Sequence, residues 1–302
     1  MTARESANLR SIGQVIAELH DDYPDLSQSA LRFLEREGLV TPVRTKGGHR
    51  LYDDAAIERV RTIKEWQAQR LTLAEVRQRL EARSGLAEPR ALAARFLAAG
   101  LAGDPNPGAA VLEADALGLP LARTFGEVLR PALVEIGDRW AAGTLRVGQE
   151  HAVSEAVREL IGVLAMRHAH PDPAGPPLLA ACVAGERHDL GLRMAVALLR
   201  AAGRRVRFLG ADVSTAFLVE EVAAWRPAAV LLSATLEARL PTVFEAVDAV
   251  RAAGMPWPTA IVGGQAVQGR ADEFRARGIV VADDDPGAAA GTVLAVVEGV
   301  AA

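Results

Sequence analysis

The chain has a single cysteine, Cys182, and only two lysines among its 302 residues. One cysteine excludes an internal disulfide framework and fits a reducing cytoplasm. No apolar run is long enough to cross a bilayer, and the first residues lack the basic-then-apolar pattern of a signal peptide. The formal net charge of −4 gives no overall basic bias, so any surface for nucleic acid must be a local patch. We therefore expect a soluble, cytoplasmic, multi-domain protein with no membrane partner.

Three regions differ in composition and periodicity. Residues 1–83 are rich in Arg and Glu and have a helical pattern. Residues 90–170 are rich in Ala and Leu at helical spacing, which predicts a four-helix bundle whose last two helices span about 121–140 and 147–167. A proline-rich breaker segment follows, and residues 177–302 form the third region. Each region is long enough to be a domain.

The third region alternates short apolar runs with helical patterns. Strands that are buried on both faces and separated by helices predict a parallel, flavodoxin-like α/β sheet. The expected strands cover residues 178–183, 206–209, 229–233, 260–262 and 279–281. The expected helices cover residues 190–202, 216–224, 242–253 and 286–297. Because such sheets bind ligands beyond the carboxyl ends of their strands, the loops there are the expected site of chemistry.

A helix-turn-helix pattern lies within the first region. Ser11 is placed to cap one helix, and a second helix over residues 27–35 ends near Gly38, which suits the left-handed position after a helix. Gly47-Gly48 predicts a hairpin turn, and Thr72 opens a capping box for a later helix. Basic residues around the hairpin suit an all-α winged helix-turn-helix head whose wing contacts phosphates.

The head resembles the DNA-binding domain of the MerR family over about residues 10–83. The motifs that carry the resemblance are Arg32-Phe33 with Glu35, then residues 38–44 and residues 48–52. Phe33 stands where the family usually has Tyr. The resemblance implies an operator in double-stranded DNA, with the sequence of that operator left open. It implies contacts to bases or phosphates by Ser29, Arg32, Arg44, Lys46, His49, Arg50 and Tyr52.

The segment after the head departs from the MerR pattern. MerR proteins resemble one another in a long coiled-coil helix that forms the dimer. Here Ser84-Gly85 and Pro89 interrupt the helical pattern before about three heptads can accumulate. A homo-oligomer, either a dimer or a tetramer, is therefore expected to form through the bundle and the α/β region.

A histidine follows the first expected strand of the α/β region. Glu186 stands two residues before His188, close enough to accept its second ring N–H, as the partner of a metal-bound imidazole does. Gly191 would let a bulky ligand approach the start of the next helix. No other His, Cys or carboxylate cluster has chelating spacing, so a closed zinc site is not expected. A single imidazole suits a metal whose other positions are filled by a macrocycle.

Two further motifs follow later strands, Ser233-Ala234-Thr235-Leu236 and Gly263-Gly264. Together with the Glu-x-His-x-x-Gly loop they resemble cobalamin-binding domains of the methionine-synthase type. The resemblance implies that His188 replaces the dimethylbenzimidazole of the cofactor as the lower cobalt ligand. It implies that the displaced nucleotide tail lies in a slot lined by Ser233, Thr235, Leu236, Gly263 and Gly264.

Trp140, Glu150 and His151 form a Trp-x9-Glu-His pattern at the junction of two expected bundle helices. With the MerR-like head and the cobalamin motifs, this pattern resembles the CarH/LitR photoreceptors. The resemblance implies that Trp140, Val147, Glu150 and His151 surround the 5′-deoxyadenosyl group of adenosylcobalamin. It also implies a repressor that binds DNA in the dark and is released by photolysis. In that family a second His follows the Trp and takes the cobalt after illumination, but here the position is Ala141.

Two alternatives stay open. A cobalamin or ligand sensor that does not respond to light is compatible with Ala141. A corrinoid carrier subunit of an enzyme is disfavoured, because such carriers have no use for a DNA-binding head and the sequence shows no nucleophile or acid/base pair. We therefore expect no enzymatic activity, and the sequence leaves target genes and the sign of regulation open.

Overall fold

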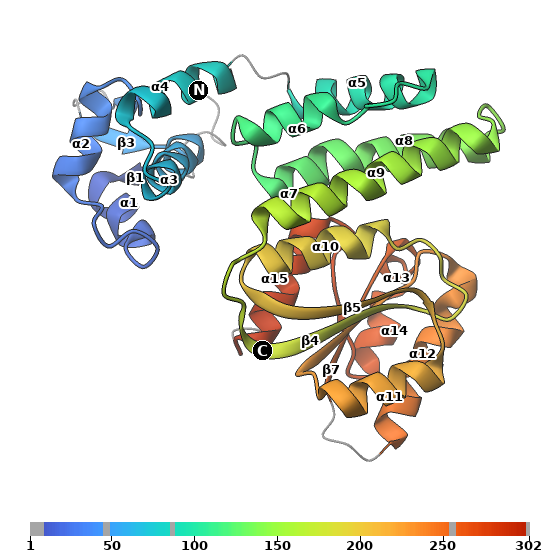
Figure 1. The fold of residues 1–302 in the computed structure, drawn as a ribbon. Coiled ribbons are helices and arrows are strands. Elements are labelled where there is room, and N and C mark those ends of the chain that lie inside the picture. The colour runs from blue at the N-terminus through green and yellow to red at the C-terminus, as the bar shows by residue number, and fades with distance from the viewer. Residues whose placement is uncertain (1–8, 45–48, 85–87, 254–257, 300–302) are drawn as a thin grey trace. The chain divides into compact units, whose positions relative to one another are not determined.

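A computed structural model describes the chain except for residues 1–8, 45–48, 85–87, 254–257 and 300–302 (Figure 1). It forms two compact units, Met1–Leu86 and Ala87–Ala302. The second unit holds both the helical bundle and the α/β layers. Within the described part of the chain, no helix is both long and apolar enough to span a membrane.

The first unit is a small helical domain with a three-stranded antiparallel sheet, in the order β1-β3-β2. Its caps follow the sequence pattern: the Ser27 side chain accepts from the amide of Ala30 at 3.1 Å, and Thr72 accepts from Glu75 at 3.3 Å. Its elements are β1 (Arg10–Ser11), α1 (Ile12–Leu19), α2 (Gln28–Arg36), β2 (Val43–Arg44), β3 (Arg50–Tyr52), α3 (Asp54–Ala68) and α4 (Leu73–Ser84).

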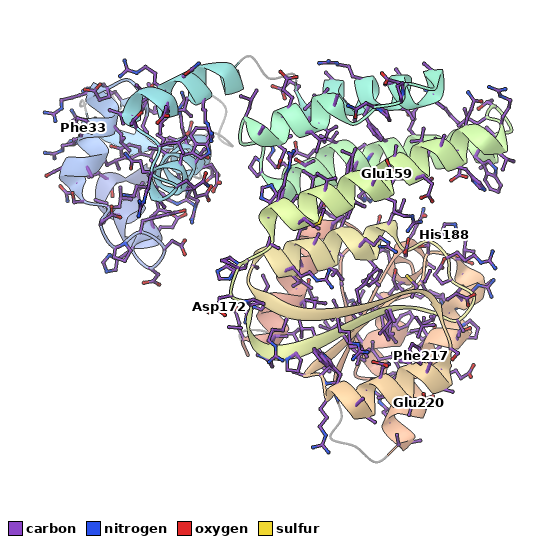
Figure 2. All side chains as sticks on the ribbon, viewed as in Figure 1. Phe33, Glu159, Asp172, His188, Phe217 and Glu220 are labelled. Carbon is purple, nitrogen blue, oxygen red and sulfur yellow. The ribbon has the colours of Figure 1, made fainter. Side chains whose placement is uncertain are left out.

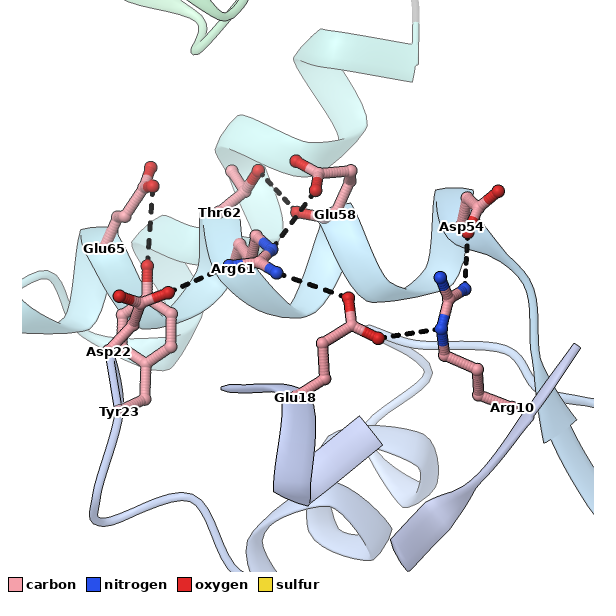
Figure 3. Close-up of polar contacts among 9 residues, drawn as sticks. All are labelled: Arg10, Glu18, Asp22, Tyr23, Asp54, Glu58, Arg61, Thr62 and Glu65. Carbon is pink, nitrogen blue, oxygen red and sulfur yellow. Dashed lines mark hydrogen bonds and ion pairs between the residues drawn. The ribbon is translucent and has the colours of Figure 1, made fainter. Parts of the chain in front are cut away.

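This unit has its own apolar core and a polar seam between α1 and α3. Val15, Leu31 and Ile63 are fully buried members of one apolar cluster. At the surface, Arg61 bonds to Glu18 at 3.4 Å, and Glu18 also pairs with Arg10 at 2.7 Å (Figure 3). Exposed ion pairs contribute little each, so the buried cluster provides most of the stability of the head.

The bundle contains an irregular helix that the sequence pattern did not reveal. A single helix over 121–140 was expected, but the structure has a π-helical segment, η1, between two α-helical parts. Pro131 lies at the start of the second part, and a proline removes one helical N–H and displaces the turn before it. The elements are α5 (Pro89–Ala102), α6 (Ala109–Ala116), α7 (Leu121–Arg123), η1 (Thr124–Leu129), α8 (Arg130–Ala141) and α9 (Val147–His168).

A five-stranded parallel sheet in the order β5-β4-β6-β7-β8 follows the bundle, as the apolar runs predicted. β4 and β5 are longer than expected, because each extends beyond its apolar run. β4 begins with a segment that contains Gly and Pro, and β5 includes Arg residues before its apolar run and Gly and Asp after it. The strands are β4 (Ala174–Val183), β5 (Arg204–Val213), β6 (Ala229–Ser233), β7 (Thr259–Gly263) and β8 (Val280–Val281). The helices are α10 (Leu190–Ala201), α11 (Thr215–Trp225), η2 (Glu237–Arg239), α12 (Leu240–Ala252), α13 (Gln265–Gln268), α14 (Ala271–Ala276) and α15 (Pro286–Val297).

Helices cover both faces of this sheet (Figure 1). Leu178, Ala180 and Cys182 of β4 pack in one cluster with α10 and α15. The alternate residues Leu179 and Ala181 pack in a second cluster with α11 and α12. The direction of strand order reverses between β5 and β6, on either side of β4, so a crevice is expected beyond the carboxyl ends of β4 and β6.

Candidate functional site

A buried carboxylate joins the two loops at this crevice. The Glu186 side chain is fully buried, and its Oε1 atom lies 2.6 Å from Nδ1 of His188. Its other oxygen, Oε2, accepts from the backbone amides of Thr235 at 2.8 Å and Leu236 at 3.1 Å. The amide of His188 also donates to Oε1, at 2.9 Å. Glu186 therefore holds the loop after β4 against the loop after β6.

This arrangement sets the charge and orientation of the imidazole. Burial by itself would raise the pKa of Glu186, but the hydrogen bonds from His188, Leu236 and Thr235 outweigh it and hold the pKa at about 2. The hydrogen bond to Glu186 in turn raises the pKa of His188. Because Nδ1 faces Glu186, Nε2 is the ring nitrogen left for a metal. The His188 side chain is 58% exposed, so that nitrogen is accessible.

The glycines expected at the cofactor site differ in how closely other atoms approach them. Gly264 has φ of +106°, and a Cβ there would lie 2.4 Å from the carbonyl oxygen of Ala234, so only glycine fits. Gly263 has no such constraint, since its nearest contact would be 3.6 Å away. Nothing lies within 4 Å of a Cβ built on Gly191, at the start of α10. Ser233 is buried at the end of β6.

Two apolar side chains and one carboxylate of the expected adenosyl pocket lie on the bundle helices α8 and α9. Trp140 at the end of α8 is 55% exposed, and Val147 at the start of α9 is 59% exposed. Glu150 accepts from Ser154 at 2.8 Å and lies 2.5 Å from Nδ1 of His151. The charge of Glu150 contributes to the raised pKa of His188, so the carboxylate on α9 and the imidazole interact electrostatically. His188 lies on the side of the α/β layers that faces the bundle (Figure 2).

A second buried carboxylate ties the bundle to the His188 loop. Asp189 is 2% exposed and accepts from Arg158 of α9 and Arg193 of α10, each at 2.7 Å. Arg130 of α8 also pairs with Asp284, two residues before the start of α15. Sequence reasoning missed these contacts, because nothing local relates Arg158 to a residue 31 positions later.

The residues predicted to contact DNA lie on α2 and around the wing. Ser29 and Arg32 are exposed on α2, and Arg44 and His49 are exposed at the wing strands. Arg50 is half-buried and pairs with Glu35 of α2 at 2.8 Å, which fixes the wing to that helix. Lys46 and the Gly47-Gly48 turn lie outside the described residues.

One of the predicted DNA contacts is wrong. Tyr52 is fully buried, and its hydroxyl donates to Glu35. Burial of the ring raises the pKa of Tyr52, and the hydrogen bond to Glu35 adds to this. Tyr52 therefore belongs to the core of the head and contacts α2 through Glu35. The sequence pattern did not distinguish the inward side of the short strand β3 from its outward side.

These residues fit a macrocycle-bound metal better than a protein chelate. Across the described ranges, no three His, Cys, Asp or Glu side chains are grouped to hold a metal ion. Burial raises the pKa of the Cys182 thiol to about 12, so it stays protonated and is a poor ligand. One accessible imidazole, oriented by a buried carboxylate, suits a single axial ligand to the cobalt of cobalamin.

The comparisons with known proteins agree with this fold. Residues 12–83 match the family described as MerR HTH family regulatory protein, and residues 92–165 and 176–294 match two families each described as B12 binding domain. Together these define a DNA-binding helix-turn-helix regulator with cobalamin-binding domains.

Two curated relatives come from Myxococcus xanthus. The chain is 35% identical to the HTH-type transcriptional repressor CarH, over 70% of this chain and 74% of that one. It is 31% identical to the HTH-type transcriptional repressor CarA, over 79% and 82%. The chain therefore belongs to the CarH family of MerR-type, cobalamin-binding transcriptional regulators, a class of DNA-binding regulators and not of enzymes.

A solved structure supports the fold of the second unit. The monomethylamine corrinoid protein of Methanosarcina barkeri superposes with a TM-score of 0.59 at 21% identity, covering 68% of this chain and 96% of that one.

Replacing Glu186 by alanine is expected to destabilise the second unit and weaken cobalamin binding. The change leaves the buried amides of Thr235 and Leu236 without their acceptor, which should cost about 2–4 kcal/mol in the free energy of unfolding. Loss of the carboxylate behind His188 should weaken cobalamin binding about 10- to 100-fold. Urea denaturation and a cobalamin titration followed by absorbance measure the two effects. Glu220→Ala, at an exposed position on α11, is the matched control, and equal behaviour of the two variants would contradict the role of Glu186.

Proposed function

We propose that the chain is a cobalamin-dependent transcriptional repressor whose hold on DNA is released by light. The observation that carries the proposal is the bridge made by Glu186, which orients His188 and fixes the loop of Thr235 and Leu236 beside it. Glu150 of the Trp-x9-Glu-His pattern contributes to the raised pKa of His188, which supports a site shared by the bundle and the α/β layers. The named repressor relatives and the MerR head support the regulatory part.

In the second unit, the α/β domain and the bundle would bind different parts of adenosylcobalamin. His188 Nε2 would ligate the cobalt from below, with Glu186 holding the other ring nitrogen. Ser233, Thr235 and Gly264 would line the slot for the nucleotide. Trp140, Val147 and Glu150 would pack against the adenosyl group, with His151 beside it. When bound, adenosylcobalamin supplies a cobalt–carbon bond that light can cleave.

Contact between the two layers would couple the cofactor to assembly. Arg158 links α9 to Asp189, the residue directly after His188, so a shift of the bundle changes contacts next to the cobalt ligand. A ligand that fits one arrangement of bundle and loop better than another shifts the equilibrium between them. In the dark arrangement, a dimer or tetramer formed through the bundle and the cobalamin domain would bring several heads to one operator.

A second candidate is a cobalamin sensor that does not respond to light. Ala141 favours it, because alanine at the end of α8 cannot ligate cobalt after loss of the adenosyl group. The two candidates share the cofactor and the DNA target, and they differ in the response of the bound cofactor to light.

Absorption spectra of protein loaded with adenosylcobalamin in darkness test the light response. We expect illumination to convert the spectrum to that of aquocobalamin bound through His188, with water or hydroxide at the upper position. The His151→Ala variant should give the same product spectrum, because His151 bonds to Glu150 and helix neighbours point about 100° apart.

Ala141→His is the matched comparison and should give a bis-histidine product. A bis-histidine spectrum in the unmodified protein that disappears in His151→Ala would contradict the assignment of a solvent ligand. An adenosylcobalamin spectrum that stays unchanged under light would favour the light-independent sensor.

A further inference from the structure

Arg239 lies beside the loop of the proposed cobalamin site, and it has no part in the contacts described so far. It is the last residue of η2, three residues after Leu236, and its guanidinium packs against the loop that carries Glu186 and His188. A Cβ built on Gly185 would lie 2.6 Å from Nη1 and 2.8 Å from Cζ of Arg239. Gly185 has φ of +77°, and its amide donates to Asp212 at 2.6 Å. Because Gly185 has no side chain, the guanidinium of Arg239 packs directly on the backbone of this loop.

This guanidinium has a donor for which no described residue provides an acceptor. Its Nε atom is buried and makes no hydrogen bond, and among the described residues no carboxylate pairs with Arg239. The neighbouring arginines differ, since Arg193 and Arg158 both bond to Asp189. A buried N–H without an acceptor is unfavourable, so such a group at the rim of a binding site points to an acceptor that arrives with the ligand.

We propose that Arg239 binds the phosphodiester of the cobalamin nucleotide loop. This inference rests on the proposed function, because it needs cobalamin in the crevice. The phosphodiester is the one negatively charged group at the periphery of cobalamin, whose other side chains are neutral amides. A guanidinium is the side chain best suited to a phosphate, since it offers several N–H donors in one plane. Arg239 lies three residues after the slot residue Leu236, in the short helix that follows the slot loop.

Cobinamide provides the test, because it keeps the corrin ring but lacks the phosphodiester and the nucleotide. The wild-type chain, Arg239→Gln and Arg239→Lys are each titrated with cobalamin and with cobinamide, and binding is followed by absorbance. Arg239→Gln is expected to bind cobalamin about 10- to 100-fold more weakly than wild type. Its affinity for cobinamide should equal that of wild type. Arg239→Lys, which keeps the charge, should fall between the two.

Arg275→Gln is the control, since it removes one positive charge from an exposed position on α14 that is paired with Asp272. It should leave both affinities unchanged, and urea denaturation should show equal stability for all variants. An equal loss of cobalamin and cobinamide binding in Arg239→Gln would overturn the proposal, because the contact would then lie on the corrin or within the loop. Full cobalamin affinity in Arg239→Gln would overturn it as well. If the wild-type chain bound neither compound, the proposed function itself would fail.

Discussion

Replacing His188 by alanine is expected to remove the axial nitrogen from bound cobalt and to weaken cobalamin binding by about 100-fold or more. Loss of a residue that only orients a metal ligand typically costs about 10- to 100-fold, and loss of the ligand itself should cost at least the upper end of that range. The imidazole is exposed, and Glu186 keeps its bonds to the amides of residues 188, 235 and 236, so the loop should stay folded. Electron paramagnetic resonance of the Co(II) form reports the axial nitrogen directly.

His170→Ala is the matched control for this experiment. His170 is exposed in the same unit, ahead of β4, and its ring bonds to the backbone of Asp172. The nitrogen coupling should be present in wild type and in His170→Ala, and absent in His188→Ala. An unchanged coupling in His188→Ala would show that a different residue, or the cofactor's own base, ligates the cobalt.

Replacing Arg32 by alanine is expected to reduce operator discrimination strongly while leaving cobalamin uptake intact. Arg32 is exposed on α2, the second helix of the helix-turn-helix, and an arginine at a base edge is worth about 1–3 kcal/mol of discrimination. The head is a compact unit with its own core, so the substitution should not change cobalamin binding by the second unit. Mobility shifts with an operator selected in vitro from random duplex DNA measure the effect.

Arg50→Ala should weaken operator binding by a different route. Arg50 pairs with Glu35, so its removal loses a wing charge and leaves Glu35 of α2 without its cationic partner, with the Tyr52 hydroxyl still bonded to it. We expect lower affinity for all sequences and a smaller dependence on salt. Arg95→Ala, an exposed position in the bundle, serves as the control. Wild-type affinity in Arg32→Ala or in Arg50→Ala would refute the role of that residue.

The sequence was sufficient to predict the α/β layers and the contact between Glu186 and His188. Apolar residues on both faces of β4 predicted a covered parallel strand, and the structure shows Leu178 and Leu179 buried in opposite clusters. The short spacing of Glu186 and His188 made their contact predictable, because two residues in one loop reach each other whatever the tertiary fold. Caps at Ser11 and Thr72 were predictable for the same reason.

Contacts that depend on tertiary packing could not be read from local patterns. The Arg158–Asp189 pair joins two layers, and Arg239 reaches Gly185 from another strand end. Tyr52 was predicted to contact DNA, but its side chain is buried in the core of the head and bonds to Glu35. The π-helical η1 also escaped prediction, because its apolar spacing still matches a regular helix.

The central claim is that the cofactor held at His188 controls DNA binding by the head, and one titration tests it. Operator binding is measured by mobility shift at fixed protein concentration with increasing adenosylcobalamin in darkness, and again on the same samples after illumination. The account predicts that binding rises with adenosylcobalamin in the dark and falls after light, and that His188→Ala shows neither change. Operator binding that is the same with and without adenosylcobalamin, in darkness and in light, would contradict it.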